Sequence, residues 1–316
     1  SSEDPEQPRQ PRNLQGLLKF ALESTKSEDA PENVEPHFGP MDEERRKFLE
    51  EALKSLTIDF VDEINESLKV LTNAASTNDE KVEALEHIID FVDDIDTAND
   101  FYKIGGFSVI LPNLSSESPE VRAGTLRLVA ELAQNNPFSQ KALLHLNILQ
   151  KLIELLSDNS NGHLAMHAIS CMVRSYEPCL AAFIEIGGLE CIIGCLQSDV
   201  DKLRIKSAFL MSSLCSEWEA IRDEFVKLEA VERVIAVIEP KEGYDPKLEA
   251  FLSALNLLVN NPNAVKICQD SKLNLKEKLD SIERINKGKE ECREEIEYGQ
   301  RIYKKCFEVE TEDSER

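Results

Sequence analysis

Three residues in the chain have the types and spacing that metal binding needs. His163, His167 and Cys171 recur every four residues, and imidazole and thiolate are the ligands that zinc prefers. On one straight helix, however, these side chains spread over about 12 Å, so only two neighbours can share an ion. We therefore predict no metal site and no cofactor.

A second candidate is the acidic run from Asp93 to Asp100, which superficially resembles a calcium-binding loop. In every register it lacks the glycine at the sixth position and the glutamate at the twelfth that such loops use. The sequence predicts a solvated helix end here instead.

Catalytic motifs are missing from the rest of the chain. Its five histidines form no H-E-x-x-H motif, and no serine stands in G-x-S-x-G. The glycine pairs Gly105-Gly106 and Gly187-Gly188 belong to neither nucleotide-binding pattern, G-x-G-x-x-G or G-x-x-x-x-G-K-[ST]. We predict that the protein is not an enzyme.

Charge and composition exclude further classes. The 316 residues include 36 Lys and Arg and 60 Asp and Glu, so the net charge is −24. A surface of this charge repels nucleic-acid phosphates. No apolar run reaches the ~18 residues that span a bilayer. We expect no nucleic-acid partner and no membrane insertion.

The cysteines and the chain ends bear on the compartment. All eight cysteines follow residue 170 without a C-x-x-C pair, so we expect small buried apolar residues in a reducing environment. The N-terminus has no apolar signal core, and the C-terminus has no retention tetrapeptide. The expected location is the cytosol, with the nucleus also open.

An internal repeat explains most of the chain. Similar short apolar segments start at Gly105, Asn147, Gly187, Glu229 and Asp270, separated by 42, 40, 42 and 41 residues. This period lies in the armadillo and HEAT range.

Within each interval, a longer run with apolar residues at helical spacing follows the aligned segment. A break such as Asn136-Pro137 or Asn261-Pro262 then opens a short helix. Three helices per interval are typical of armadillo repeats, whereas HEAT repeats have two. The sequence therefore predicts an all-α armadillo-repeat solenoid of about four repeats.

The predicted organisation has four parts. Residues 1–40 form a flexible region with a short amphipathic helix at 13–25, and residues 41–96 form N-terminal capping helices, one on each side of residue 56. Residues 97–270 hold the repeats. Residues 271–316 form C-terminal capping helices and an acidic tail.

The long helices predict a binding surface. Peptide-binding armadillo proteins place asparagines along the concave face, but this chain has Glu131, Cys171 and Ser213 there, which disfavours capture of an extended peptide. The same helices carry cations that suit an acidic patch on a folded partner; the alternative is that they are ordinary solubilising charges. These cations are Arg127, Arg174, Arg204 and Lys206.

An isolated apolar segment lies near the N-terminus. Leu14, Leu17 and Leu18 recur at helical spacing with Phe20 beside them, between polar flanks. A tethered helix this short tends to fold on a partner. Docking on its own solenoid is equally consistent with the spacing.

Six segments of the chain can be compared with known families: NLQGLLKFALEST, PMDEERRKFLEEAL, DDIDTANDFYKIGG, AQNNPFSQK, AISCMVRS and KLRIKSAFLM. Together they resemble the armadillo-type nucleotide exchange factors of 70-kDa heat-shock protein chaperones, of the cytosolic HspBP/Fes type. The segments run in family order over roughly residues 13–310.

The resemblance implies a function and a partner. The concave armadillo face would embrace lobe II of the chaperone's ATPase domain and open the nucleotide cleft, so that ADP leaves. Ala98, Asn99 and Lys206 match family positions that contact the chaperone. Leu14, Leu17, Leu18 and Phe20 fall in a segment similar to a motif that assists substrate release.

Two hypotheses follow from the sequence. The first is a monomeric co-chaperone that promotes nucleotide exchange. The alternative is an armadillo scaffold that binds a protein partner without changing nucleotide turnover.

Overall fold

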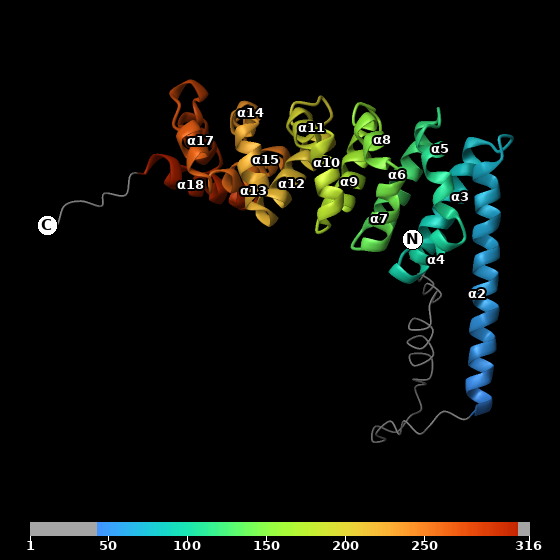
Figure 1. Cartoon of the computed structure of the whole chain (residues 1–316). Helices are drawn as coiled ribbons and strands as arrows, with labels where there is room; N and C mark the ends of the chain where they lie inside the picture. The colour runs from blue at the N-terminus through green and yellow to red at the C-terminus, as the bar shows by residue number, and fades with distance from the viewer. Residues whose placement is uncertain (1–42, 309–316) are drawn as a thin grey trace, which may run out of the picture. The chain divides into compact units, whose positions relative to one another are not determined.

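The computed structural model describes residues 43–308, apart from the side chains of residues 56–59. Every regular element in that range is an α-helix or a short 3-10 helix (Figure 1), so the all-α prediction is confirmed. The predicted helix at 13–25 and the acidic tail lie outside the described residues. The chain divides into two compact units between Asp94 and Ile95.

The described part of the first unit is a pair of helices, α2 (Glu43–Thr72) and α3 (Asn78–Phe91). The prediction of two capping helices within α2 was wrong, because neither proline nor glycine interrupts its 30 residues. A capping box starts α3: the Glu80 amide donates to Thr77 Oγ1 (3.2 Å), and the Thr77 amide donates to Glu80 Oε2 (2.7 Å). The buried face of α3 packs against α2.

The second unit repeats one pattern, a short helix, a middle helix and a long helix. The middle helix of the first repeat is split into a 3-10 turn and a single α-turn. The last three helices keep the same order, although we predicted residues 271–316 as a cap. The elements are α4 (Ile95–Lys103), η1 (Gly106–Val109), α5 (Ile110–Leu114), α6 (Pro119–Ala133), α7 (Pro137–His145), α8 (Ile148–Leu155), α9 (Gly162–Val173), α10 (Glu177–Glu185), α11 (Gly188–Cys195), α12 (Asp201–Glu217), α13 (Glu219–Lys227), α14 (Ala230–Val237), α15 (Pro246–Leu258), α16 (Pro262–Cys268), η2 (Ser271–Leu273), α17 (Leu275–Asn286), η3 (Glu290–Cys292) and α18 (Arg293–Phe307).

One backbone turn joins the short and the middle helix in four successive repeats. The residue there is left-handed each time: Gly105 (φ 83°), Asn147 (φ 55°), Gly187 (φ 84°) and Glu229 (φ 63°). Glycine adopts this conformation at no steric cost, which explains the first member of each Gly-Gly pair.

The second glycine of each pair has a different role, because an aromatic ring occupies the space of its missing side chain. A Cβ on Gly106 would lie 2.2 Å from the Phe101 ring, and one on Gly188 would lie 2.5 Å from the Phe183 ring. The glycine thus lets the middle helix approach the short helix closely.

The long helices form the centre of the second unit. Each one packs against the next, from α6 through α9, α12 and α15 to α18, and they follow one another in a row (Figure 1). Because the long helices have neighbours on several sides, their apolar residues are not confined to one stripe. The buried core side chains include Leu126, Val129, Leu132, Ile169, Met172, Met211, Leu214, Leu252 and Leu255.

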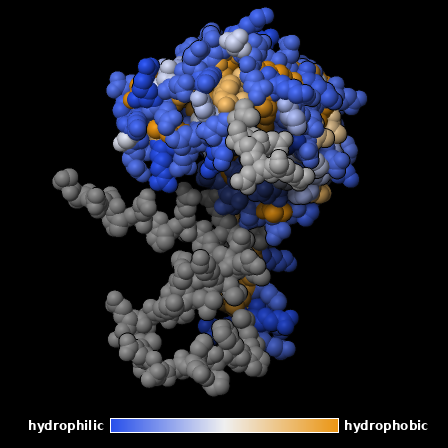
Figure 2. Space-filling model, turned by 90° about the vertical axis from the view of Figure 1, so that its left-hand side faces the viewer, coloured by the Kyte–Doolittle hydropathy of each residue, from blue (hydrophilic) through white to orange (hydrophobic). Residues whose placement is uncertain are grey.

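The outer surface of the repeats is mainly polar at the C-terminal end. In Figure 2, where this end faces the viewer, the surface is mainly hydrophilic with separate hydrophobic spots. A terminal repeat of a solenoid needs such an outer face because no neighbour covers it.

In the described range, no single helix has the length and apolar composition to span a bilayer. One bent pair, Glu177–Glu185 and Gly188–Cys195, passes that test by length and composition, with an angle of 77° between its helices.

Candidate functional site

An open groove of about 620 Å³ runs between α9 and α12 and reaches α15. Its lining combines two cations, one carboxylate, a histidine, hydroxyls and apolar side chains from three long helices. The residues are Met166, His167, Ser170, Arg174, Lys206, Phe209, Ser212, Ser213, Ser216, Glu217 and Leu257.

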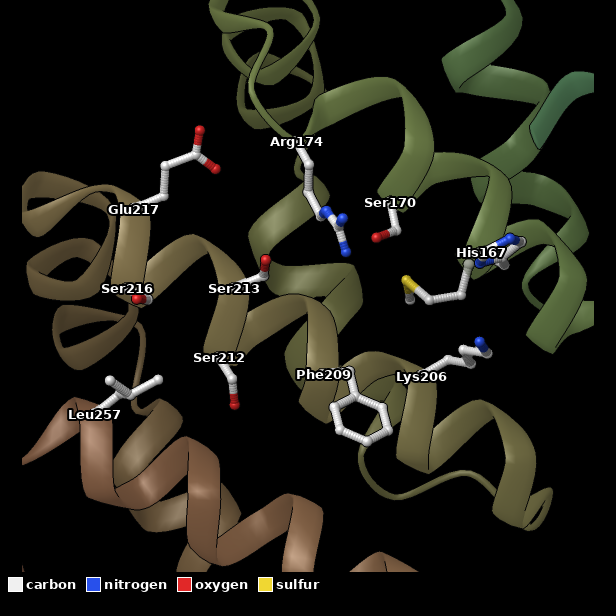
Figure 3. A pocket seen from close by; sticks show the side chains of 11 residues that line it. His167, Ser170, Arg174, Lys206, Phe209, Ser212, Ser213, Ser216, Glu217 and Leu257 are labelled. Carbon is white, nitrogen blue, oxygen red and sulfur yellow. The ribbon is translucent and has the colours of Figure 1, made fainter. Parts of the chain in front are cut away.

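Two of the predicted cations lie in this groove. Figure 3 shows Arg174 extending between Ser170 of α9 and Ser213 of α12, while Lys206 points into the same groove from α12. Both side chains belong to exposed residues.

The cations of this surface lower the pKa values of two nearby histidines. Burial first, and then the charges of Lys202, Lys206 and Arg127, lower the pKa of His163. Burial, Lys206 and Arg174 lower the pKa of His167 in the same way. Exposed Arg127 of α6 therefore belongs to the same cationic surface as Arg174 and Lys206.

An exposed aromatic side chain adds apolar contact area. Phe209 is 53% exposed although it lies on the core helix α12, one turn from Lys206. We did not predict Phe209 from the sequence, because a phenylalanine inside an apolar helix usually belongs to the core. The signal that identifies it is the spacing of three residues from an exposed lysine, which places both on one face.

Arg204, the fourth predicted cation, does not line the groove. Its side chain is 22% exposed, its Nε donates to the Leu196 carbonyl (3.0 Å), and its guanidinium lies 5.2 Å from the centre of the Phe251 ring. It also pairs with Asp201 (3.8 Å). Arg204 therefore joins α12 to the end of α11 and to α15 of the next repeat instead of facing a partner.

The two N-terminal contact positions of the resemblance lie on α4, outside the groove. Ala98 is only 2% exposed, so its methyl group offers no surface to a partner. Asn99 is half-buried, and its Oδ1 accepts a hydrogen bond from Nδ2 of Asn136, the N-cap of α7 (3.2 Å).

The Asn99 contact has a counterpart at the last junction between repeats, where α15 leads into α16. Asn261, the N-cap of α16, donates from Nδ2 to Asp223 Oδ1 on α13 (2.7 Å). Each N-cap asparagine thus holds the preceding short helix, which gives Asn99 and Asp223 the same structural role.

The aspartate-rich run is only partly solvated, which corrects the prediction of a solvated helix end. Helix α4 begins at Ile95, and its residues Thr97, Ala98 and Phe101 are buried. Asp96 and Asp100 are exposed and lie on the opposite side of this helix.

The possible zinc ligands occupy one helix, α9, as predicted. Cys171 Sγ lies 3.8 Å from His167 Nε2, and burial raises the pKa of the Cys171 thiol. The described range contains no group of three or more His, Cys, Asp or Glu arranged to hold a metal ion. All eight cysteines are free thiols, five buried and three half-buried.

The fold and the groove define the class of this protein: an armadillo-type repeat solenoid with a cationic, aromatic-bearing groove along its long helices. A designed armadillo repeat protein is similar in fold, with a TM-score of 0.60 at 15% identity over 76% of this chain and 98% of that one. Another designed armadillo repeat protein, solved in complex with the peptide (KR)4, gives 0.61 at 16% identity over 76% and 98%.

Sequence comparison identifies the family. Residues 14–101 match the family described as nucleotide exchange factor Fes1, and residues 97–236 match the SIL1/FES1/HPBP1 C-terminal domain. Hsp70-binding protein 1 of Mus musculus is 30% identical over 97% of this chain and 89% of its own length. Hsp70 nucleotide exchange factor FES1 of Saccharomyces cerevisiae is 24% identical over 61% and 66%. The chain belongs to this family of Hsp70 nucleotide exchange factors, as its sequence motifs predicted.

Proposed function

We propose that this protein binds lobe II of the ATPase domain of an Hsp70 chaperone through the groove between α9 and α12, and thereby promotes ADP release. It acts as a monomeric, non-enzymatic co-chaperone in the cytosol or nucleus. The observation that carries the proposal is the cationic surface of Arg127, Arg174 and Lys206 in a chain of net charge −24.

The groove supports binding to an acidic, folded surface. Its cations project from two different repeats, so a partner must present carboxylates at matching separations, which favours a rigid surface over a flexible chain. Phe209 supplies apolar area beside them, a combination typical of interface hot spots.

Nucleotide release requires more than tight binding. A partner that binds both states of the ATPase domain equally shifts no equilibrium, so the groove must bind the arrangement with an open nucleotide cleft more tightly. A rigid stack of repeats meets this requirement, because it fits one lobe orientation better than the other.

Charge reversal tests the assigned surface. We expect Arg174→Glu and Lys206→Glu each to weaken binding to the isolated ATPase domain by about tenfold or more, because each replaces a charge-assisted contact with repulsion. The matched control is Lys227→Glu on α13, an exposed lysine outside the groove that pairs with Glu224. Calorimetry measures the affinity, and equal binding by all variants contradicts the proposal.

The same variants distinguish an exchange factor from a scaffold. A scaffold binds the chaperone with the same groove dependence but leaves the rate of ADP release unchanged. In an exchange factor, substitutions in the groove weaken binding to the chaperone and also reduce the acceleration of ADP release.

The N-terminal segment carries a separate proposal. We propose that Leu14, Leu17, Leu18 and Phe20, which lie outside the described residues, assist the release of substrate from the chaperone. Deletion of residues 1–26 is expected to leave ADP release intact while slowing release of a bound peptide. Unchanged peptide release in this deletion contradicts the role.

A further inference from the structure

The groove between α9 and α12 holds two cations that have no hydrogen bond or salt bridge with any other described residue. They are Arg174 and Lys206, both exposed. Arg122 of α6, by contrast, is held by Asp158 at 2.9 Å. An acidic chain that leaves two cations free in one groove makes them available to an added anion.

Serine hydroxyls line the same groove beside these cations. Ser213 lies next to the Arg174 side chain (Figure 3), and Ser216 follows Ser213 by three residues on α12. Residues at this spacing share one face of a helix, with their Cβ atoms about 5–6 Å apart. A negative charge on Ser216 would therefore face the same cations.

Ser216 differs from the other three serines of the lining in its exposure. Those three are half-buried, whereas Ser216 is exposed in the last turn of α12. The helix ends at Glu217, and the backbone of Trp218 is extended (φ −132°, ψ 106°). Because the last turn of a helix opens more readily than its interior, an enzyme can reach the Ser216 hydroxyl in the folded protein.

Two carboxylates follow Ser216 along the chain. Glu217 and Glu219 stand one and three residues after it, and both are exposed. Glu219 pairs with Arg222 (2.9 Å), but its side chain is 80% exposed, and such a surface pair is weak. Two carboxylates at these positions suit a serine kinase whose substrate site carries cations.

We propose that Ser216 is a phosphorylation site, and that its phosphate pairs with Arg174 and closes the groove to an acidic partner. A serine kinase transfers the γ-phosphoryl group of ATP to Ser216. A P–O bond forms to the Ser216 Oγ, the bond from the γ-phosphorus to the β-phosphate oxygen breaks, and ADP leaves. The hydroxyl proton passes to a base of the kinase.

The phosphate reverses the charge of the groove. Arg174 and Lys206 against Glu217 give the lining one net positive charge, since the lowered pKa of His167 keeps its imidazole neutral near pH 7. A phosphoserine adds about −1.5 to −2 at that pH, and its oxygens accept hydrogen bonds from a guanidinium. The loss of chaperone binding rests on the proposed function, whereas the pairing with Arg174 does not.

Treatment of the full-length protein with ATP and an acidophilic serine kinase tests the site. Mass spectrometry is expected to find phosphate on Ser216, and Glu217→Gln/Glu219→Gln is expected to slow its incorporation by about fivefold or more. Glu239→Gln/Glu242→Gln is the matched control, because it removes two exposed carboxylates outside the groove and leaves the incorporation unchanged. Absence of phosphate on Ser216 in the unaltered protein overturns the proposal.

Phosphorus NMR of the phosphorylated protein tests the pairing without a chaperone. The resonance is assigned by its absence in Ser216→Ala. We expect the second pKa of the phosphate to lie below about 5.5, against about 6 for a free phosphoserine, because the Arg174 guanidinium favours the dianion. Arg174→Gln is expected to restore the ordinary pKa.

The control for this measurement is Arg233→Gln, which removes an exposed cation of α14 outside the groove and leaves the phosphate pKa lowered. A phosphate pKa of about 6 or above in the unaltered protein overturns the proposal. An equal pKa in Arg174→Gln also overturns it.

Affinity for the isolated ATPase domain tests the regulation. We expect the phosphorylated protein to bind at least about tenfold more weakly than the unphosphorylated protein, because like charges then face each other. Ser216→Ala treated with the kinase is expected to bind as the unphosphorylated protein does. Equal affinity of the two forms overturns the regulatory role. Failure of the unphosphorylated protein to bind overturns the proposed function and this role with it, whereas the NMR measurement alone decides the pairing.

Discussion

Arg204 and Lys206 stand two residues apart on α12 and carry the same charge, but their surroundings differ. The Arg204 guanidinium is held by a carbonyl and an aromatic ring, whereas Lys206 is exposed in the groove. Residue type alone does not separate these roles, because Arg204 faces the end of α11 and the next repeat, whereas Lys206 faces solvent.

One pair of substitutions separates them by experiment. We expect Arg204→Met to lower the free energy of unfolding by about 1–3 kcal/mol, because the Leu196 carbonyl loses its donor and the Phe251 ring loses its cation. Lys206→Met is the matched control and is expected to change stability by less than about 0.5 kcal/mol. Urea unfolding measures both, and equal losses contradict the assignment.

The two histidines beside the groove predict a dependence on pH. Their pKa values are lowered in the folded protein, so the unfolded chain binds protons more readily. Stability from this source is present above the unfolded pKa of about 6.5 and falls as the pH decreases below it.

Replacement of the histidines isolates that contribution. Burial and carboxylate repulsion raise the pKa of Glu295 and Glu249. These two groups favour the folded state as the pH decreases, but they do so equally in the unaltered protein and in the variant without the histidines. His163→Gln/His167→Gln should therefore lose less stability than the unaltered protein between pH 7.5 and 5.5. Equal losses in urea unfolding at the two pH values contradict this prediction.

At the scale of elements, the sequence predicted the helices of the repeats better than the caps. The Asn-Pro breaks mark real starts, since Asn136 and Asn261 cap α7 and α16. Within α2, by contrast, we predicted two helices, one on each side of residue 56, although neither proline nor glycine interrupts the segment.

Two glycines of α11 give opposite predictions. Gly188→Ala is expected to destabilise the protein by roughly 1–3 kcal/mol, because its Cβ would lie 2.5 Å from the Phe183 ring. Gly194→Ala has open space around the new Cβ and is expected to stabilise the helix by up to about 1 kcal/mol. Thermal unfolding measures both, and a shift of the same sign in the two variants counts against the packing described.

At the scale of the whole molecule, the repeat period predicted the all-α solenoid because each repeat contains its own helical signals. The groove could be predicted only in part. Its lining extends from Met166 to Leu257, and no local pattern shows that α9, α12 and α15 bring these residues together. Arg174 and Lys206 were found because positive residues are a minority in so acidic a chain.

We propose that the groove couples binding of the chaperone to release of its nucleotide. The most direct measurement is the release of fluorescent ADP from Hsp70 in stopped flow, with saturating unaltered protein or Arg174→Glu/Lys206→Glu. We expect the unaltered protein to accelerate ADP release and the double variant to leave it near the rate of the chaperone alone. Release that is unchanged by the unaltered protein, or equally accelerated by the double variant, would contradict it.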